Sequence, residues 1–102
     1  MISSDDADRQ ARMLSEIQRK VLLQCHRKNP LNYSKIADEI GESYERVQFA
    51  GRALQKLNLA RIGLMSSPSI YYGRANEYSG SAIFLTENGE TVRSAVLKLM
   101  YG

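Results

Sequence analysis

The sequence has few of the residues that support covalent or metal-dependent stability. Its 102 residues include one cysteine, Cys25, one histidine, His26, and no tryptophan. A single cysteine cannot form an internal disulfide, and one cysteine beside one histidine supplies too few ligands for a structural zinc site. We therefore expect no metal and no cofactor, with Cys25 as a small buried apolar residue and His26 on the surface.

Long apolar runs and catalytic groupings are missing as well. No stretch approaches the roughly 18 to 20 apolar residues that cross a bilayer, and the acidic start MISSDDAD lacks the basic and apolar parts of a signal peptide. We expect a cytoplasmic protein without a membrane partner. Glu39 and Glu45 could form an acid and base pair, but no nucleophile, glycine-rich phosphate loop or metal cluster accompanies them, so we expect no enzyme.

The chain does hold enough apolar residues for one core. With 43% hydrophobic and 25% charged residues it has the composition of a folded domain, and its length fits a single domain over residues 1–102. The formal net charge of +3 is unevenly distributed. Residues 8–28 carry six cations and two carboxylates, and residues 43–74 carry five cations and one carboxylate, which leaves +4 in each. We expect the acidic stretch 36–42 between them to face away from any phosphate.

Apolar spacing predicts a long helix at each end of the chain. Ser3 or Ser4 can cap a helix over 5–28 that ends at Asn29-Pro30, and Thr86 can cap a helix over 87–101. The apolar positions of the first are Ala7, Ala11, Leu14, Ile17, Val21 and Cys25, widened by Met13 and Leu22, and those of the second are Val92, Ala95, Val96, Leu99 and Met100. The first helix is longer than the domain's own core needs, and residues 96–101 are mostly apolar, so we expect the terminal helices to build a homodimer.

A helix-turn-helix is predicted over 34–57. Ser34 caps a short helix that ends at Gly41, and Ser43 caps a helix over 44–57. The inner face of this second helix is formed by Val47, Ala50, Leu54 and Leu57. Residues 31–33 are a short extended link, and residues 58–85 form a hairpin with strands at 59–65 and 81–85 and a long tip. The fold class is therefore mainly α with a small β hairpin (α+β).

The run from Ile36 to Val47 resembles the helix-turn-helix signature. Ala37 is small where the two helices cross, and Gly41 permits the left-handed backbone of the turn. The wedge between the helices is filled by Ile36, Ile40 and Val47. Glu42 stands where an apolar residue usually follows the glycine.

The order of elements, together with the run Phe84 to Gly89, resembles winged helix-turn-helix transcriptional regulators over residues 14–99. These include the multiple-antibiotic-resistance-regulator (MarR) and phenolic-acid-regulator (PadR) groups, in which a Leu-Thr-Glu-x-Gly run opens the helix after the wing. Long terminal helices that build a two-fold dimer are also typical of those groups.

The resemblance implies that the helix over 43–57 enters the major groove of double-stranded DNA. Arg46 would grip a guanine in a bidentate contact, Gln48 would pair with adenine, and Phe49 would meet a thymine methyl or pack on a neighbouring element. Arg74, near the tip of the hairpin, would reach into the minor groove. The complete predicted set is Ser43 and Tyr44 on phosphate or sugar, Arg46, Gln48 and Phe49 on bases, Arg52, Lys56 and Arg61 on phosphate, and Arg74, with Glu45 on the same outward face.

The sequence thus predicts a homodimeric regulator of transcription that binds double-stranded DNA sequence-specifically. A protein-interaction module that uses the same surfaces is one alternative, favoured by the modest charge and by Phe49. A single-stranded nucleic acid or RNA binder is another, with Tyr71, Tyr72 and Tyr78 stacking on bases. Those tyrosines could also pack within the hairpin or line a pocket for a small-molecule effector, whose identity the sequence does not give.

Overall fold

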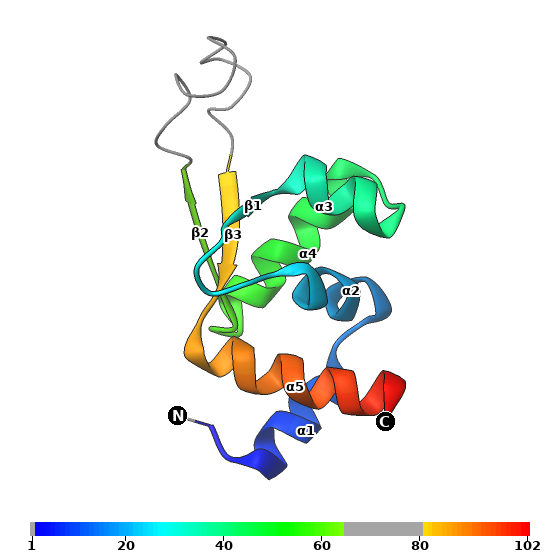
Figure 1. Ribbon diagram of the computed structural model, residues 1–102, viewed down its shortest axis with the longest axis vertical. Helices are drawn as coiled ribbons and strands as arrows, with labels where there is room; N and C mark the ends of the chain where they lie inside the picture. Colours follow the sequence, from blue (N-terminus) through cyan, green and yellow to red (C-terminus); the bar gives the residue numbers. More distant parts are fainter. Residues whose placement is uncertain (1, 65–80) are drawn as a thin grey trace, which may run out of the picture.

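A computed structural model describes residues 2–64 and 81–102, which form five helices and three short strands (Figure 1). The order is α1 (Ser4–Met13), α2 (Glu16–Gln24), β1 (Leu31–Asn32), α3 (Tyr33–Ile40), α4 (Tyr44–Lys56), β2 (Ala60–Leu64), β3 (Ser81–Leu85) and α5 (Glu87–Tyr101). α1 and α5 lie together at one end of the molecule, while β2 and β3 run toward the other (Figure 1). The predicted class, mainly α with a small β component, is confirmed. The predicted hairpin tip, with Arg74 and the three tyrosines, lies outside the described residues.

The predicted helix over 5–28 is two helices. The Ser15 hydroxyl accepts a hydrogen bond from the Gln18 backbone N–H at 3.2 Å, and the Gln18 side chain accepts one from the Ser15 N–H at 3.0 Å. This reciprocal capping box begins a new helix. Arg19 donates to the carbonyls of Ala11 and Arg12 at 3.0 and 2.9 Å, which satisfies the open end of α1. The prediction of one continuous helix was wrong because the apolar spacing continues across a boundary that these polar contacts set, and α2 also ends at Gln24, before residue 28.

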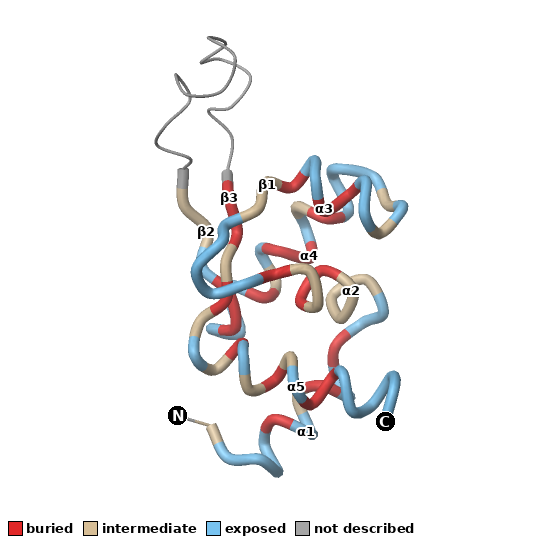
Figure 2. The backbone as a smooth tube through the Cα atoms, viewed as in Figure 1, coloured by how far each residue is buried: buried red, intermediate tan, exposed pale blue. Residues whose placement is uncertain are grey.

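The apolar stripe of this segment is buried despite the break. Ala7, Ala11, Leu14, Val21, Leu22 and Cys25 belong to the core, whereas Met13 is 78% exposed and does not widen the stripe. α1 packs against α5 of the same chain, and exposed positions follow the outer sides of both helices (Figure 2). The amino-terminal segment is therefore buried against its own chain, so its length does not indicate a second subunit.

The helix-turn-helix forms as predicted at its turn, with differences at its outer ends. Gly41 has φ 70° and ends α3, and the Ser43 hydroxyl caps α4 by accepting from the Arg46 N–H at 3.2 Å. Asn32 caps α3 in place of Ser34, because its side-chain oxygen reaches the Lys35 N–H at 2.8 Å. Leu57 is 46% exposed and is the C-cap of α4, so its assignment to the inner face was wrong.

The predicted two-stranded hairpin is part of a three-stranded antiparallel sheet in the order β1-β3-β2. Leu31 on β1 and Ile62 on β2 both lie opposite Ile83 of β3, which is fully buried. The segment predicted as an extended link thus pairs with the open edge of β3 and satisfies its backbone groups.

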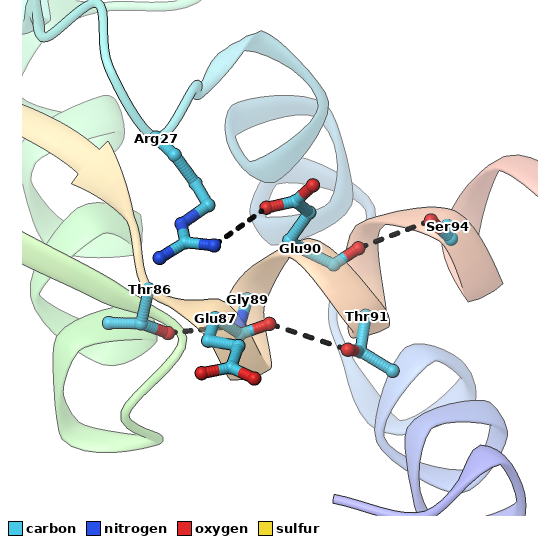
Figure 3. Close-up of polar contacts among 7 residues, drawn as sticks. All are labelled: Arg27, Thr86, Glu87, Gly89, Glu90, Thr91 and Ser94. Carbon is cyan, nitrogen blue, oxygen red and sulfur yellow. Dashed lines mark hydrogen bonds and ion pairs between the residues drawn. The ribbon is translucent and has the colours of Figure 1, made fainter. Parts of the chain in front are cut away.

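The start of α5 is fixed against the end of α4 by Thr86. The Thr86 hydroxyl accepts a hydrogen bond from the Gly89 N–H at 2.9 Å, which confirms Thr86 as the helix cap (Figure 3). The same hydroxyl donates to the Asn58 carbonyl at 2.7 Å. Gly89 is buried, and a Cβ atom on it would overlap the backbone carbonyl of Leu59. Only glycine therefore lets the first turn of α5 approach the chain just before β2.

Gly89→Ala should lower the free energy of unfolding by about 3 kcal/mol, because the methyl group would meet backbone that cannot move aside. Urea unfolding followed by circular dichroism measures this change. Gly63→Ala is the matched control, since a Cβ there meets no atom of the described residues within 4 Å. Equal stability of the two variants would contradict the close packing described here.

Candidate nucleic-acid interface

The buried side of α4 determines which of its residues face outward. Val47, Ala50, Gly51 and Leu54 are buried, and a Cβ on Gly51 would lie 2.8 Å from the Tyr33 ring atom Cε1, so the helix sits directly on that ring. The predicted contact residues lie away from this packing: Ser43, Tyr44, Arg46, Phe49, Arg52 and Lys56 are exposed, and Gln48 is half-buried. The structure thus gathers the α4 members of the predicted set on an accessible surface.

Tyr44 is held at the beginning of α4 by an aromatic contact. Its ring meets the Tyr33 ring edge to face, with centroids 5.9 Å apart, and it remains 43% exposed. Tyr33 is buried, and no described residue bonds its hydroxyl. Burial raises the pKa of Tyr33, partly opposed by the positive charge of Arg52. Tyr44 is therefore a partly exposed residue, held by the Tyr33 ring, at the amino-terminal edge of the outward face.

Arg46 is ion-paired in this structure. Its Nη1 atom donates to Oε1 of Glu42 at 2.9 Å, four residues earlier in the chain. The side chain of Arg46 is 64% exposed and that of Glu42 is 22% exposed. We expected the acidic stretch 36–42 to face away from the interface, but Glu42 lies against the residue predicted to contact guanine. The i, i+4 spacing of Glu42 and Arg46 is the signal in the sequence from which this pair could have been predicted.

Phe49 is 77% exposed and does not pack into a neighbouring element. It borders a shallow hollow of about 430 Å³ between α2 and α4. Most of the surface that lines this hollow is apolar, and Ile17 and Ala50 contribute to it. The polar lining residues are Ser15, Gln18, Glu45 and Arg46. An exposed aromatic ring beside Arg46 is available to meet either a base or an apolar partner.

Arg61 is separated from the outward face of α4. It is exposed on β2 and lines another hollow together with Arg27 and residues 84–88, at the beginning of α5. Arg27 is ion-paired there with Glu90 at 3.5 Å (Figure 3). The structure therefore places Arg61 near Arg27 and the acidic start of α5, where Glu87 lines the same hollow, while Arg74 lies outside the described residues.

Within residues 2–64 and 81–102, no three His, Cys, Asp or Glu side chains are grouped as metal ligands, and no helix there is long and apolar enough to cross a membrane. Cys25 is fully buried, as expected, and its Sγ atom donates to the Val21 carbonyl at 3.2 Å.

A helix-turn-helix followed by antiparallel strands and a closing helix makes this chain a winged-helix protein. S. aureus MepR, in a mutant bound to an oligodeoxyribonucleotide, is similar with a TM-score of 0.65 and 19% identity, over 93% of this chain and 65% of that one. A MepR mutant from a multidrug-resistant S. aureus clinical isolate is similar with a TM-score of 0.64 and 19% identity, over 94% and 63%. This chain thus spans slightly less than two thirds of the length of those chains. The likeness confirms the predicted winged-helix fold.

Comparisons by sequence add no family to this result. No protein-family model matches the chain, and no curated protein matches it.

The Cys25 thiol should resist modification in the native protein. Burial raises its pKa to about 12, with a smaller opposing effect of Arg93, and a thiol must lose its proton to react. A colorimetric disulfide reagent at pH 8 should therefore react only after guanidinium unfolding, with one equivalent per chain. Rapid reaction of the folded protein would show that the core opens around Cys25.

Proposed function

We propose that the protein binds double-stranded DNA and regulates transcription as a homodimer. The carrying observation is the winged-helix fold with the outward face of α4 exposed, where Arg46, Arg52 and Lys56 are accessible. The likeness to a MepR mutant bound to an oligodeoxyribonucleotide supports the same function. The proposal needs no cofactor and no catalytic step, and it agrees with the predicted cytoplasmic location.

In this proposal α4 enters the major groove with its amino-terminal half against the bases. Arg46 contacts guanine O6 and N7, a bidentate contact worth roughly 1 to 3 kcal/mol of discrimination, and Gln48 contacts an adenine. Arg52 and Lys56 neutralise phosphates, and their counterions are released into solution. Ser43 and Tyr44 contact the sugar-phosphate backbone. Arg61 and Arg74 would reach phosphate and the minor groove from the strands and their connection.

The second subunit covers the apolar end of α5. Leu97, Leu99, Met100 and Tyr101 are 37%, 45%, 39% and 75% exposed in the single chain, which is costly for four neighbouring apolar side chains. A two-fold dimer through this end would present two α4 helices to one face of a duplex, about 34 Å apart. A short pseudo-palindromic site is the matching DNA sequence.

A protein-interaction module is the second candidate, and Phe49 favours it. A largely exposed phenylalanine beside an apolar hollow between α2 and α4 would suit a partner's apolar side chain. The tyrosines of the single-strand hypothesis lie outside the described residues, so that hypothesis gains no support here. Retention on duplex DNA separates the first candidate from the second.

Arg52→Ala with Lys56→Ala should weaken binding to every duplex and lower the slope of log affinity against log salt by about 0.9 per lost phosphate contact. Fluorescence anisotropy titrations of labelled duplex at two or more salt concentrations measure both quantities. Arg9→Ala, an exposed arginine on α1, is the control and should leave both unchanged.

Two results would contradict DNA binding. The first is a wild-type protein whose affinity for duplex does not change with salt. The second is a stoichiometric complex with one protein partner and no retention on duplex DNA, which would favour the interaction module.

Leu99→Glu with Met100→Glu should convert a dimer into a monomer, because charges would be buried at the proposed contact. Sedimentation equilibrium at micromolar concentration should give twice the chain mass of 11.5 kDa for the wild type and 11.5 kDa for the variant. Leu57→Glu, at an equally exposed leucine that follows the last residue of α4, should remain dimeric. A wild-type mass of 11.5 kDa would remove the homodimer from the proposal.

A further inference from the structure

Backbone hydrogen bonds fix the positions of both Glu42 and Arg46. The backbone N–H groups of Gly41 and Glu42 both donate to the Ala37 carbonyl, at 2.9 and 3.1 Å, which fixes where the Glu42 side chain leaves the turn. The Arg46 backbone N–H is bonded to the Ser43 hydroxyl at the first turn of α4. The turn and the helix cap therefore fix how far apart the backbones of the two residues lie, and this distance allows their side chains to pair.

The exposed fractions of the two side chains show that Glu42 holds Arg46 in place. Glu42 is 22% exposed at its side chain, and Arg46, which extends past it, is 64% exposed. A partly buried carboxylate gives up less freedom when it holds a partner than an exposed one does. Glu42 thus acts as a fixed anchor under the more accessible guanidinium.

One edge of the Arg46 guanidinium is available for a further hydrogen-bond acceptor. A guanidinium carries five N–H donors in a planar fork, and the Glu42 contact uses Nη1. In the part of the chain that the structure describes, nothing accepts a hydrogen bond from Nε or Nη2 of Arg46. These two nitrogens form the edge that fits the O6 and N7 atoms of guanine.

The carboxylate also changes the net charge that Arg46 presents. Glu42 cancels the positive charge of Arg46 at a distance of 2.9 Å, so the pair attracts phosphate only weakly. Arg52 and Lys56, for which no ion pair with a described residue is found, keep their full charge on the same helix. Attraction to phosphate, which depends on charge, would thus come from Arg52 and Lys56. Recognition of a base, which depends on geometry, would come from Arg46.

We propose that Glu42 is a specificity-determining positioning residue, which holds Arg46 for a guanine contact and suppresses its binding to phosphate. This inference rests on the proposed binding of double-stranded DNA and adds a role for an acidic residue inside that interface. Glu42 acts through Arg46 and touches no base itself.

The test begins with a duplex selected from a random pool by the wild-type protein. The base pair that Arg46 contacts is the one whose preference disappears in Arg46→Ala. At that base pair, Glu42→Gln should lose roughly tenfold in discrimination between the selected duplex and its substituted versions. On a duplex of unrelated sequence, the same variant should gain up to about 0.9 in salt slope, because Arg46 becomes free to contact phosphate.

Glu39→Gln is the matched control, since it makes the same change of charge at an exposed residue three positions earlier. It should keep wild-type discrimination. In the Arg46→Ala background, Glu42→Gln should change neither quantity, an outcome that a general structural role for Glu42 would not produce. If Glu42→Gln does not fold, as judged by its thermal melt, Glu42→Asp takes its place with the same expected loss of discrimination.

The outcomes separate the two levels of the proposal. Wild-type protein that selects no duplex overturns DNA recognition and the role of Glu42 together. Wild-type protein that selects a duplex, with Glu42→Gln discriminating as well as wild type, overturns the role of Glu42 alone.

Discussion

The seating of α4 on the Tyr33 ring is the constraint on which the proposed interface depends. Gly51 lets the helix backbone lie against that ring and against Ile83 of the central strand, where a Cβ would be 2.8 and 3.2 Å from side-chain atoms. Rotating α4 about its axis would drive a side chain into this contact, so the outward direction of Arg46, Phe49 and Arg52 is fixed by the core. The exposure of the proposed binding surface is thus a consequence of packing on the opposite side of the same helix (Figure 2).

Local signals in the sequence predicted the parts of the fold that depend on nearby residues. Gly41, Ser43 and Thr86 were identified because a left-handed turn or a helix cap involves atoms within a few residues. The break at Ser15 is equally local, yet the uninterrupted apolar spacing concealed it and the capping pair with Gln18 was overlooked. β1 was missed for another reason: its partner strand lies about fifty residues away, and two residues carry no period of their own.

The candidate site was predictable to the same extent. Helical spacing identified the outward face of α4, because Val47, Ala50 and Leu54 define the buried side. It could not show that Phe49 would stay exposed, or that Arg61 would lie with Arg27 near the start of α5, since both depend on how separate elements come together. The ion pair of Arg46 with Glu42 was not predicted, because Glu42 belongs to an acidic stretch that we expected to face away from phosphate.

Pairing of charges reconciles a modest net charge with the proposed binding to a polyanion. Two cations near the proposed interface and the strands, Arg46 and Arg27, are paired with Glu42 and Glu90. Such partly exposed pairs contribute about 1 kcal/mol or less to stability, but each one cancels a positive charge that would otherwise attract phosphate. A chain of +3 net charge would then bind arbitrary duplex weakly. Its affinity for a particular site would come from geometry, because Arg46, while paired with Glu42, keeps a second edge whose N–H groups fit a base that offers matching acceptors.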